Sequence, residues 1–161
     1  MKGDPAIIRT LNAVLTNELT AVNQYFLHAR MFESWGLTHL GNVIYEESIG
    51  EMKHADVLSD RILFLDALPN YQRLLPLRIG QSIREQFESD MSIEVEVVER
   101  LRPGIAMCRS KGDITSANLL EQILADEEEH IDYLETQLEL INKLGEQLYL
   151  SKTIATPPTN G

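Results

Sequence analysis

Cysteine is nearly absent from this chain of 161 residues, and long apolar runs are missing altogether. The single Cys108 excludes an internal disulfide and is compatible with a reducing cytoplasm. No run of 18 apolar residues occurs, so we expect no membrane-spanning helix. The first five residues lead into a periodic segment rather than an apolar core, which argues against a signal peptide. We therefore expect a cytoplasmic protein.

Positive charge is also scarce, because 14 Lys and Arg stand against 25 Asp and Glu and give a net charge of −11. This balance argues against nucleic acid as a partner and favours cations. Apolar residues make up 43% of the chain, which is typical of a globular protein. We expect one domain over residues 1–153 and a flexible C-terminal tail over residues 154–161, which include two consecutive prolines.

Apolar residues recur with helical periodicity through nearly the whole chain, and no strand pattern competes with them. Capping residues and glycines delimit four long helices and one short helix. We expect these helices to run from Pro5 to Gly36, Thr38 to Leu65, Ser82 to Gly112, Asp113 to Gly145 and Glu146 to about Thr153. Pro103 lies inside the third of them, where it should kink or split the helix.

The connections between the predicted helices indicate their arrangement. Helices of roughly 30 residues span about 45 Å and must pack side by side to share a core. Short turns at Gly36 and Gly112 predict two antiparallel hairpins. About 17 residues, from Asp66 to Ser82, join the hairpins, which is enough to run the length of the molecule. The sequence therefore predicts an all-α four-helix bundle with a long crossover between helices two and three and a short fifth helix.

Acidic and histidine residues interrupt the apolar seam of each long helix. They are Glu18, Glu51, His54, Glu94, Glu127 and His130. A buried acid is costly unless it is paired or bound to a metal. Two Glu-x-x-His sequences are present, and a spacing of three places both side chains on one helical face, where they can bind one ion.

The spacings of these six residues repeat between the two predicted hairpins. Glu18 and Glu51 are 33 residues apart, as are Glu94 and Glu127, and equivalent residues of the hairpins are 76 apart. A set of satisfied core polar residues would not explain such a repeat. Four carboxylates and two imidazoles suit iron or manganese, and they match the ligand pattern of ferritin-like di-iron proteins.

The symmetry of this pattern divides the ligands between two ions. Glu51 and Glu127 would bridge them, with Glu18 and His54 on one ion. Glu94 and His130 would bind the other.

The chain also resembles the bacterioferritin family, over residues 1 to about 150. The resemblance is carried by the opening MKGD, Asn17–Leu19, Asn23–Arg30 (NQYFLHAR), Glu47–Ile49, Glu51–Asp56 (EMKHAD), Arg61–Leu65 (RILFL), Asp126–Glu128 and His130–Asp132. It implies a homo-oligomeric shell of 24 subunits, built from twofold dimers, that oxidises Fe²⁺ with O₂ or H₂O₂ and stores ferric mineral. It further implies Tyr25 as a reductant beside the di-iron centre, and a ferredoxin or reductase that supplies electrons for iron release.

A second apolar stripe follows the outer side of the first two predicted helices. With Glu51 and His54 facing inward, Met52 projects about 130° away from them. The other members of the stripe, with one polar neighbour, are Leu19, Asn23, Phe26, Tyr45 and Ile49. From the residues alone we expect a subunit interface. The resemblance implies haem b in that interface, with Met52 of each subunit as an axial ligand.

Several positions depart from the family pattern or carry weaker expectations. Glu46 and Gly50 stand where relatives with an inner-surface iron site have histidine and aspartate, so such a site is unsupported here. We expect His28, Trp35 and His39 at the surface or in an interface. Apart from Glu127, residues 126–129 are expected to form a solvated face.

Two alternative functions remain beside iron storage. A di-iron oxygenase or peroxidase of rubrerythrin type is disfavoured because the chain lacks paired cysteines for a rubredoxin-like site. A haem electron-transfer protein with a vestigial metal site is disfavoured by the intact set of six ligands. The sequence leaves open whether the metal pair is a stable cofactor or a gate for iron, and which oxidant is used.

Overall fold

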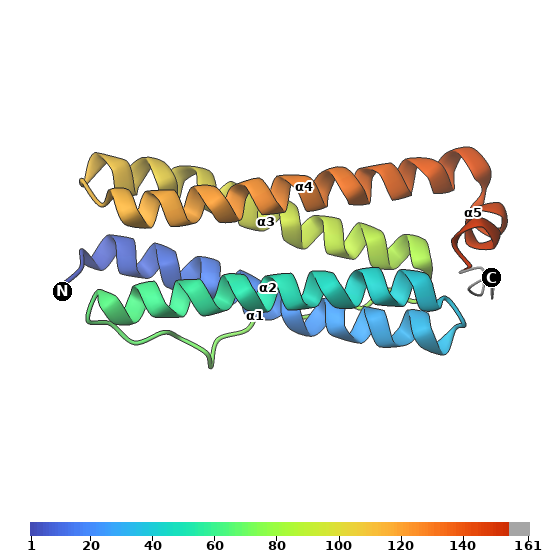
Figure 1. The fold of residues 1–161 in the computed structure, drawn as a ribbon, viewed down its shortest axis with the longest axis horizontal. Coiled ribbons are helices and arrows are strands. Elements are labelled where there is room, and N and C mark those ends of the chain that lie inside the picture. Colours follow the sequence, from blue (N-terminus) through green and yellow to red (C-terminus); the bar gives the residue numbers. More distant parts are fainter. Residues whose placement is uncertain (155–161) are drawn as a thin grey trace, which may run out of the picture.

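The computed structural model describes residues 1–154, and these residues form five helices and no strand. The helices are α1 (Pro5–Ser34), α2 (Thr38–Phe64), α3 (Ile83–Ser110), α4 (Ile114–Leu144) and α5 (Glu146–Thr153). The four long helices lie side by side, and α5 turns across one end of the bundle (Figure 1). This arrangement confirms the predicted all-α bundle. Of the predicted tail, only Ile154 belongs to the described residues, and residues 155–161 lie outside them.

The predicted capping residues begin the helices as expected. Asp4 accepts from the amide of Ala6, Ser82 accepts from the amide of Glu85, and Asp113 accepts from the amide of Ser116. Gly36 and Gly112 have φ angles of 83° and 80°, which the two hairpin turns require and which glycine adopts without strain. No helix among the described residues combines the length and the apolar character needed to cross a membrane.

Pro103 does not split α3, so that part of the expectation is wrong. Its ring lies on an exposed face of the helix, so the missing amide costs one hydrogen bond without a clash in the core. The adjacent Gly104 is buried and packs closely on α1, because a Cβ at this position would lie 2.8 Å from Thr10 Cγ2. The predicted kink stays a prediction.

The crossover between α2 and α3 runs along α1 and is held there by side chains rather than by a sheet or helix. Four polar side chains of α1 accept hydrogen bonds from crossover amides: Asn12 from Asn70, Thr20 from Leu75, Gln24 from Arg78, and His28 from Gly80. These side chains recur at multiples of four residues, so they follow one ridge that winds slowly around α1. Some of the backbone amides of the crossover therefore find hydrogen-bond acceptors on α1.

The prediction for His28 is wrong, because the side chain is 0% exposed. The crossover covers it on one side and α3 meets it on the other. Trp35 and His39 are exposed, as expected.

The apolar core consists of two clusters at the two halves of the bundle. One includes Leu11 and Leu15 of α1 with Leu58 and Ile62 of α2, and the other includes Phe32 with Phe87 of α3. Between them, at the middle of the four helices, lies a layer of buried acids and histidine. The packing that surrounds this layer removes water from it and holds each backbone in place.

Candidate metal centre

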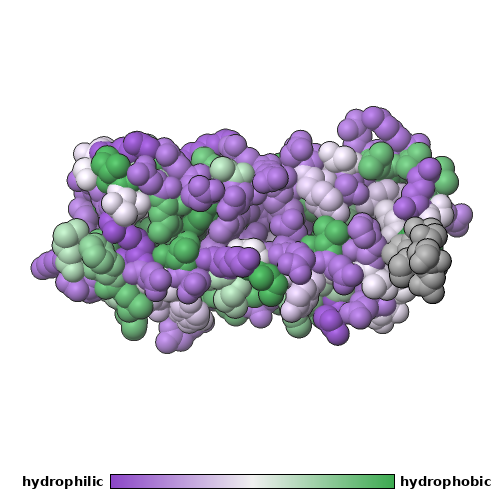
Figure 2. Space-filling model, in the orientation of Figure 1, coloured by the Kyte–Doolittle hydropathy of each residue, from purple (hydrophilic) through white to green (hydrophobic). Residues whose placement is uncertain are grey.

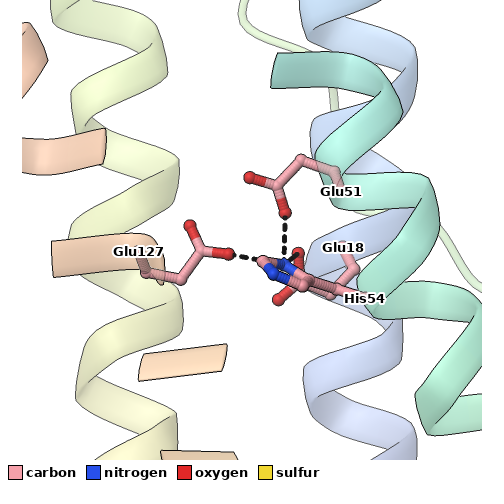
Figure 3. Close-up of side chains that lie close together, drawn as sticks. All are labelled: Glu18, Glu51, His54 and Glu127. Atoms are coloured by element: carbon pink, nitrogen blue, oxygen red, sulfur yellow. Dashed lines mark hydrogen bonds and ion pairs between the residues drawn. The ribbon is translucent and has the colours of Figure 1, made fainter. Parts of the chain in front are cut away.

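The six predicted ligands meet in this central polar layer, although they come from four helices. Glu18 is on α1, Glu94 on α3, and each of α2 and α4 contributes one Glu-x-x-His pair. Five of the six are buried, and His54 is partly exposed. Figure 3 shows His54 lying between three carboxylates, with α4 on one side and α1 and α2 on the other.

The first half of the centre is built around His54. Its Nδ1 lies 2.9 Å from Glu127 Oε1, 3.3 Å from Glu51 Oε2 and 3.6 Å from Glu18 Oε2 (Figure 3). The carboxylates thus converge on one imidazole nitrogen. This is the geometry of a ligand set that surrounds a common point.

The second half is built in the same way around His130. Its Nδ1 lies 3.0 Å from Glu94 Oε1 and 3.6 Å from Glu47 Oε2. The half-buried Glu47 was not among the predicted ligands. It lies one turn before Glu51 on α2. The sequence pattern identified Glu51, which belongs to a Glu-x-x-His pair, and did not identify Glu47.

Two overlapping groups of donor atoms result. One contains Glu18, Glu51, His54 and Glu127, and the other contains Glu51, Glu94, Glu127 and His130, with the donor atoms of each group within 4.8 Å of one another. Glu51 and Glu127 belong to both groups. The two groups are related as the repeated sequence spacing requires.

Unpartnered polar atoms in the centre fit a bound cation. Buried atoms without a hydrogen-bond partner include Glu18 Oε1, Glu94 Oε2, both carboxylate oxygens of Glu127 and His130 Nε2. Glu127 Oε1 meets His54 only at ion-pair distance. Leaving such atoms unpaired costs about 1–3 kcal/mol each, and more for charged groups. Oxygen and imidazole donors in this combination are the ligands that iron and manganese accept.

Without a metal, protons balance the charge of the centre. Burial, together with the nearby charges of Glu18 and Glu94, raises the pKa of Glu51 well above its ordinary value. Burial opposes protonation of His54, but hydrogen bonds and charge from Glu18 and Asp126 outweigh it and raise its pKa to about 9. The pKa of His130 is also raised, since Glu94 outweighs the effect of burial.

Asp126 is exposed, as expected of a solvated face, and it also contacts the centre. Its Oδ2 lies 2.9 Å from His54 Nε2. A carboxylate in this position fixes the orientation of a metal-binding imidazole and leaves the other nitrogen free for the metal. Asp126 directly precedes Glu127, but no spacing rule distinguished it from the exposed acids that follow.

Tyr25 is fully buried against the second half of the centre. Its hydroxyl donates a hydrogen bond to Glu94 Oε1. Its ring meets the ring of His130 edge to face, with the centroids 5.4 Å apart. Burial and the charge of Glu94 raise the pKa of Tyr25 well above its ordinary value, which favours the protonated hydroxyl as a donor.

A pocket of about 370 Å³ leads from the surface to the centre. Its walls come from α2 and α4. Acidic residues line it: Glu47, Glu51, Asp126, Glu127 and Glu129. Figure 2 shows this face of the molecule, where hydrophilic residues predominate across the middle. Gly50, which has no side chain, contributes to the wall of the pocket. A Cβ at this position would meet no atom within 4 Å.

The residues of the second apolar stripe behave unequally. Met52 is 45% exposed, and Phe26 and Tyr45 are also exposed. The ring centroids of Phe26 and Tyr45 lie 5.9 Å apart. Ile49 is partly buried and Asn23 is exposed. Met52, Ile49 and Tyr45 follow one another by three and four residues on the outer face of α2.

Leu19 differs from the expected outward stripe. It is buried within an apolar cluster of its own chain, because it follows Leu15 by four residues and shares its face.

Comparison with known proteins gives one consistent family. Residues 8–144 match the family model described as a ferritin-like domain. The bacterioferritin BfrA of Mycobacterium tuberculosis is 62% identical over 159 residues, which cover 99% of this chain and 100% of that protein. The bacterioferritin of Streptomyces coelicolor is 60% identical over 154 residues, covering 96% and 92% of the two chains.

Solved structures agree with the sequence relatives. The structure of Mycobacterium tuberculosis bacterioferritin BfrA superposes with a TM-score of 0.96 at 62% identity, covering 99% of this chain and 100% of the other. A second mycobacterial bacterioferritin structure also gives a TM-score of 0.96, at 60% identity and full coverage of both chains.

Proposed function

This chain belongs to the bacterioferritins of the ferritin-like family, which are iron-storage proteins, and from that membership we propose that it oxidises Fe²⁺ at an intrasubunit di-iron centre. The ferric product is then stored as mineral. One observation carries the proposal: two overlapping donor groups share Glu51 and Glu127 at the middle of the bundle. An acid-lined pocket connects them to the surface.

We assign the ligands by the two donor groups. Glu18 and His54 would hold one iron and Glu94 and His130 the other, and Glu51 and Glu127 would serve both, since they belong to both groups. Four carboxylates offset the charge of two divalent ions and keep the buried centre close to neutral. When bound there, each Fe²⁺ would supply one electron to O₂ or H₂O₂ and become Fe³⁺.

Other residues of the chain serve this centre. The acids at the pocket mouth attract Fe²⁺ from solution, and Asp126 keeps His54 turned so that Nδ1 faces the ligands. Tyr25 holds Glu94 through its hydroxyl, and we place it as a reductant next to the centre. A ferredoxin or reductase would supply the electrons for iron release.

The outer face of α1 and α2 fits a haem-binding dimer interface. An exposed methionine among exposed aromatic rings offers a thioether ligand in apolar surroundings. We propose that Met52 of each of two twofold-related subunits would hold haem b between them. Twofold dimers would assemble further into a 24-subunit shell in the cytoplasm.

An anaerobic titration of the metal-free protein with Fe²⁺, followed by admission of oxygen, tests the proposal. We expect a rapid absorbance increase whose amplitude saturates at two Fe²⁺ per chain, because the chain offers two donor groups. A chain that binds haem but gives no rapid phase would instead be an electron-transfer protein. The measurement is stopped-flow absorbance at increasing ratios of iron to protein.

Metal binding should release protons, in an amount that depends on pH. With a pKa of about 9, His54 is protonated at pH 7 in the metal-free chain, and it must lose this proton to bind a metal. We therefore expect proton release at pH 7, and metal affinity that increases as the pH rises towards 9. A pH indicator in weakly buffered solution measures the release during anaerobic titration with Co²⁺. Binding without proton release would contradict the prediction.

A further inference from the structure

A buried polar cluster beside the metal centre takes no part in the ligand set. It consists of Gln24 and His28 on α1 and Asp90 on α3, and no member is more than 1% exposed. Gln24 Nε2 donates to Asp90 Oδ1 at 2.9 Å, and His28 Nδ1 lies 2.8 Å from the same oxygen. Two side chains of α1 therefore converge on one carboxylate oxygen of α3. Such buried groups destabilise the fold unless these bonds are made.

The tautomer of His28 follows from its second contact. The Gly80 amide donates to His28 Nε2 at 3.1 Å, so this nitrogen carries no proton. Nδ1 therefore carries the proton and donates it to Asp90. The imidazole is held at both nitrogens, and Asp90 Oδ1 accepts two hydrogen bonds.

The same cluster holds the end of the crossover. The Arg78 amide donates to Gln24 Oε1 at 2.9 Å, beside the contact between Gly80 and His28. Gly80 lies so close to α3 that a Cβ there would be 2.3 Å from the Gln86 amide nitrogen. The position of the crossover and the packing of α1 on α3 therefore depend on one set of side chains.

This packing also determines where Tyr25 meets the metal centre. Gln24 directly precedes Tyr25 on α1, and Asp90 lies one helical turn before Glu94 on α3. The Tyr25 hydroxyl donates to Glu94 Oε1 and lies 3.5 Å from the backbone carbonyl oxygen of Asp90. The register that joins Gln24 to Asp90 is thus the register that joins Tyr25 to Glu94.

We propose that Asp90 is a positioning residue for the half of the metal centre that contains Glu94 and His130, and that it acts through Tyr25. By accepting from Gln24 and His28, it holds α1 and α3 in the register that keeps the Tyr25 hydroxyl on Glu94. Without this contact Glu94 keeps only its contact with His130 Nδ1 and is held less firmly in the shared donor group. The inference rests on the proposed function of the centre.

Anaerobic titration with Co²⁺ tests the proposal without turnover, because Co²⁺ accepts the same oxygen and nitrogen ligands and its visible absorption reports its coordination. The wild-type chain is expected to bind two Co²⁺. Asp90→Ala is expected to weaken one of them by about tenfold, the effect of losing an outer-shell partner, and to leave the other unchanged. Asn12→Ala is the matched control, since the Asn12 side chain also holds the crossover, through Leu68 and Asn70, and lies far from Asp90 along α1.

A double-mutant cycle with Tyr25→Phe tests the route. If Asp90 acts through the Tyr25 hydroxyl, Asp90→Ala causes no further loss of affinity in the Tyr25→Phe background. Additive losses, wild-type affinities in Asp90→Ala, or an equal loss in Asn12→Ala would each overturn the proposal.

A milder variant covers the case in which Asp90→Ala does not fold. Gln24→Met removes one donor to Asp90 with a side chain of similar size. It is expected to weaken binding of the same Co²⁺ by less than Asp90→Ala does, because the His28 contact with Asp90 remains. An unchanged affinity would overturn the proposal. Failure of the wild-type chain itself to bind two Co²⁺ would refute the proposed function instead.

Discussion

Glu127→Ala is expected to slow the rapid phase of Fe²⁺ oxidation by about a hundredfold or more. Changes to outer-shell partners of a metal cost up to about a hundredfold, and the loss of a direct ligand should cost at least as much. Glu127 belongs to both donor groups, so its loss removes a ligand from both ions at once. Stopped-flow absorbance at two Fe²⁺ per chain gives the rate. Glu128→Ala is the matched control, because Glu128 is the next residue of α4 and its side chain is exposed.

The same variant should fold without difficulty. Both oxygens of Glu127 are buried without a hydrogen-bond partner, so removing them relieves a desolvation cost in the metal-free chain. The loss of the ion pair between Glu127 Oε1 and His54 Nδ1 opposes this gain. We expect metal-free Glu127→Ala to remain folded, with a thermal unfolding midpoint close to that of the metal-free wild type. An oxidation rate within a few-fold of wild type, from a variant that folds, would refute the assignment of Glu127 as a bridging ligand.

Met52→Leu is expected to abolish haem binding while the rapid phase of iron oxidation stays unchanged. Leucine keeps the apolar volume at the interface but has no sulfur to bind haem iron. Because Met52 projects outward from α2, away from Glu51 and His54, the metal centre should not respond. The Soret absorbance per chain after reconstitution with haem measures the loss.

Two further variants sharpen this result. Met107→Leu is the matched control, since Met107 packs at the edge of the core on α3. This variant should bind haem as the wild type does. Met52→His offers a different axial ligand and is expected to bind haem with an altered spectrum. Stoichiometric haem in Met52→Leu would show that Met52 is not an axial ligand.

The residues that the sequence identified are those whose role depends on neighbours in their own helix. Asp4, Ser82 and Asp113 cap helices through bonds to amides two or three residues away, so local spacing is sufficient to predict them. The Glu-x-x-His pairs are visible for the same reason, because i and i+3 share a helical face. The pairs repeat after 76 residues, and a further Glu precedes each pair by 33 residues; this repeat predicted that four helices would bring six ligands together.

The residues that the sequence missed depend on segments far away in the chain. His28 bonds to Asp90 and Gly80, which are 62 and 52 residues distant, so its own helix could not show that it is buried. Asp126 became a neighbour of His54 only when α4 packed near α2, across 72 residues.

By itself, then, the sequence determined the helices, their order, the crossover and the six residues of the central polar layer. Only the tertiary structure decided which further polar side chains touch that layer, and that Leu19 is buried although the sequence placed it in an outward stripe. The physical reason is that periodicity fixes the direction of a side chain relative to its own helix axis. Its surroundings depend on which helix or crossover residue packs against that face.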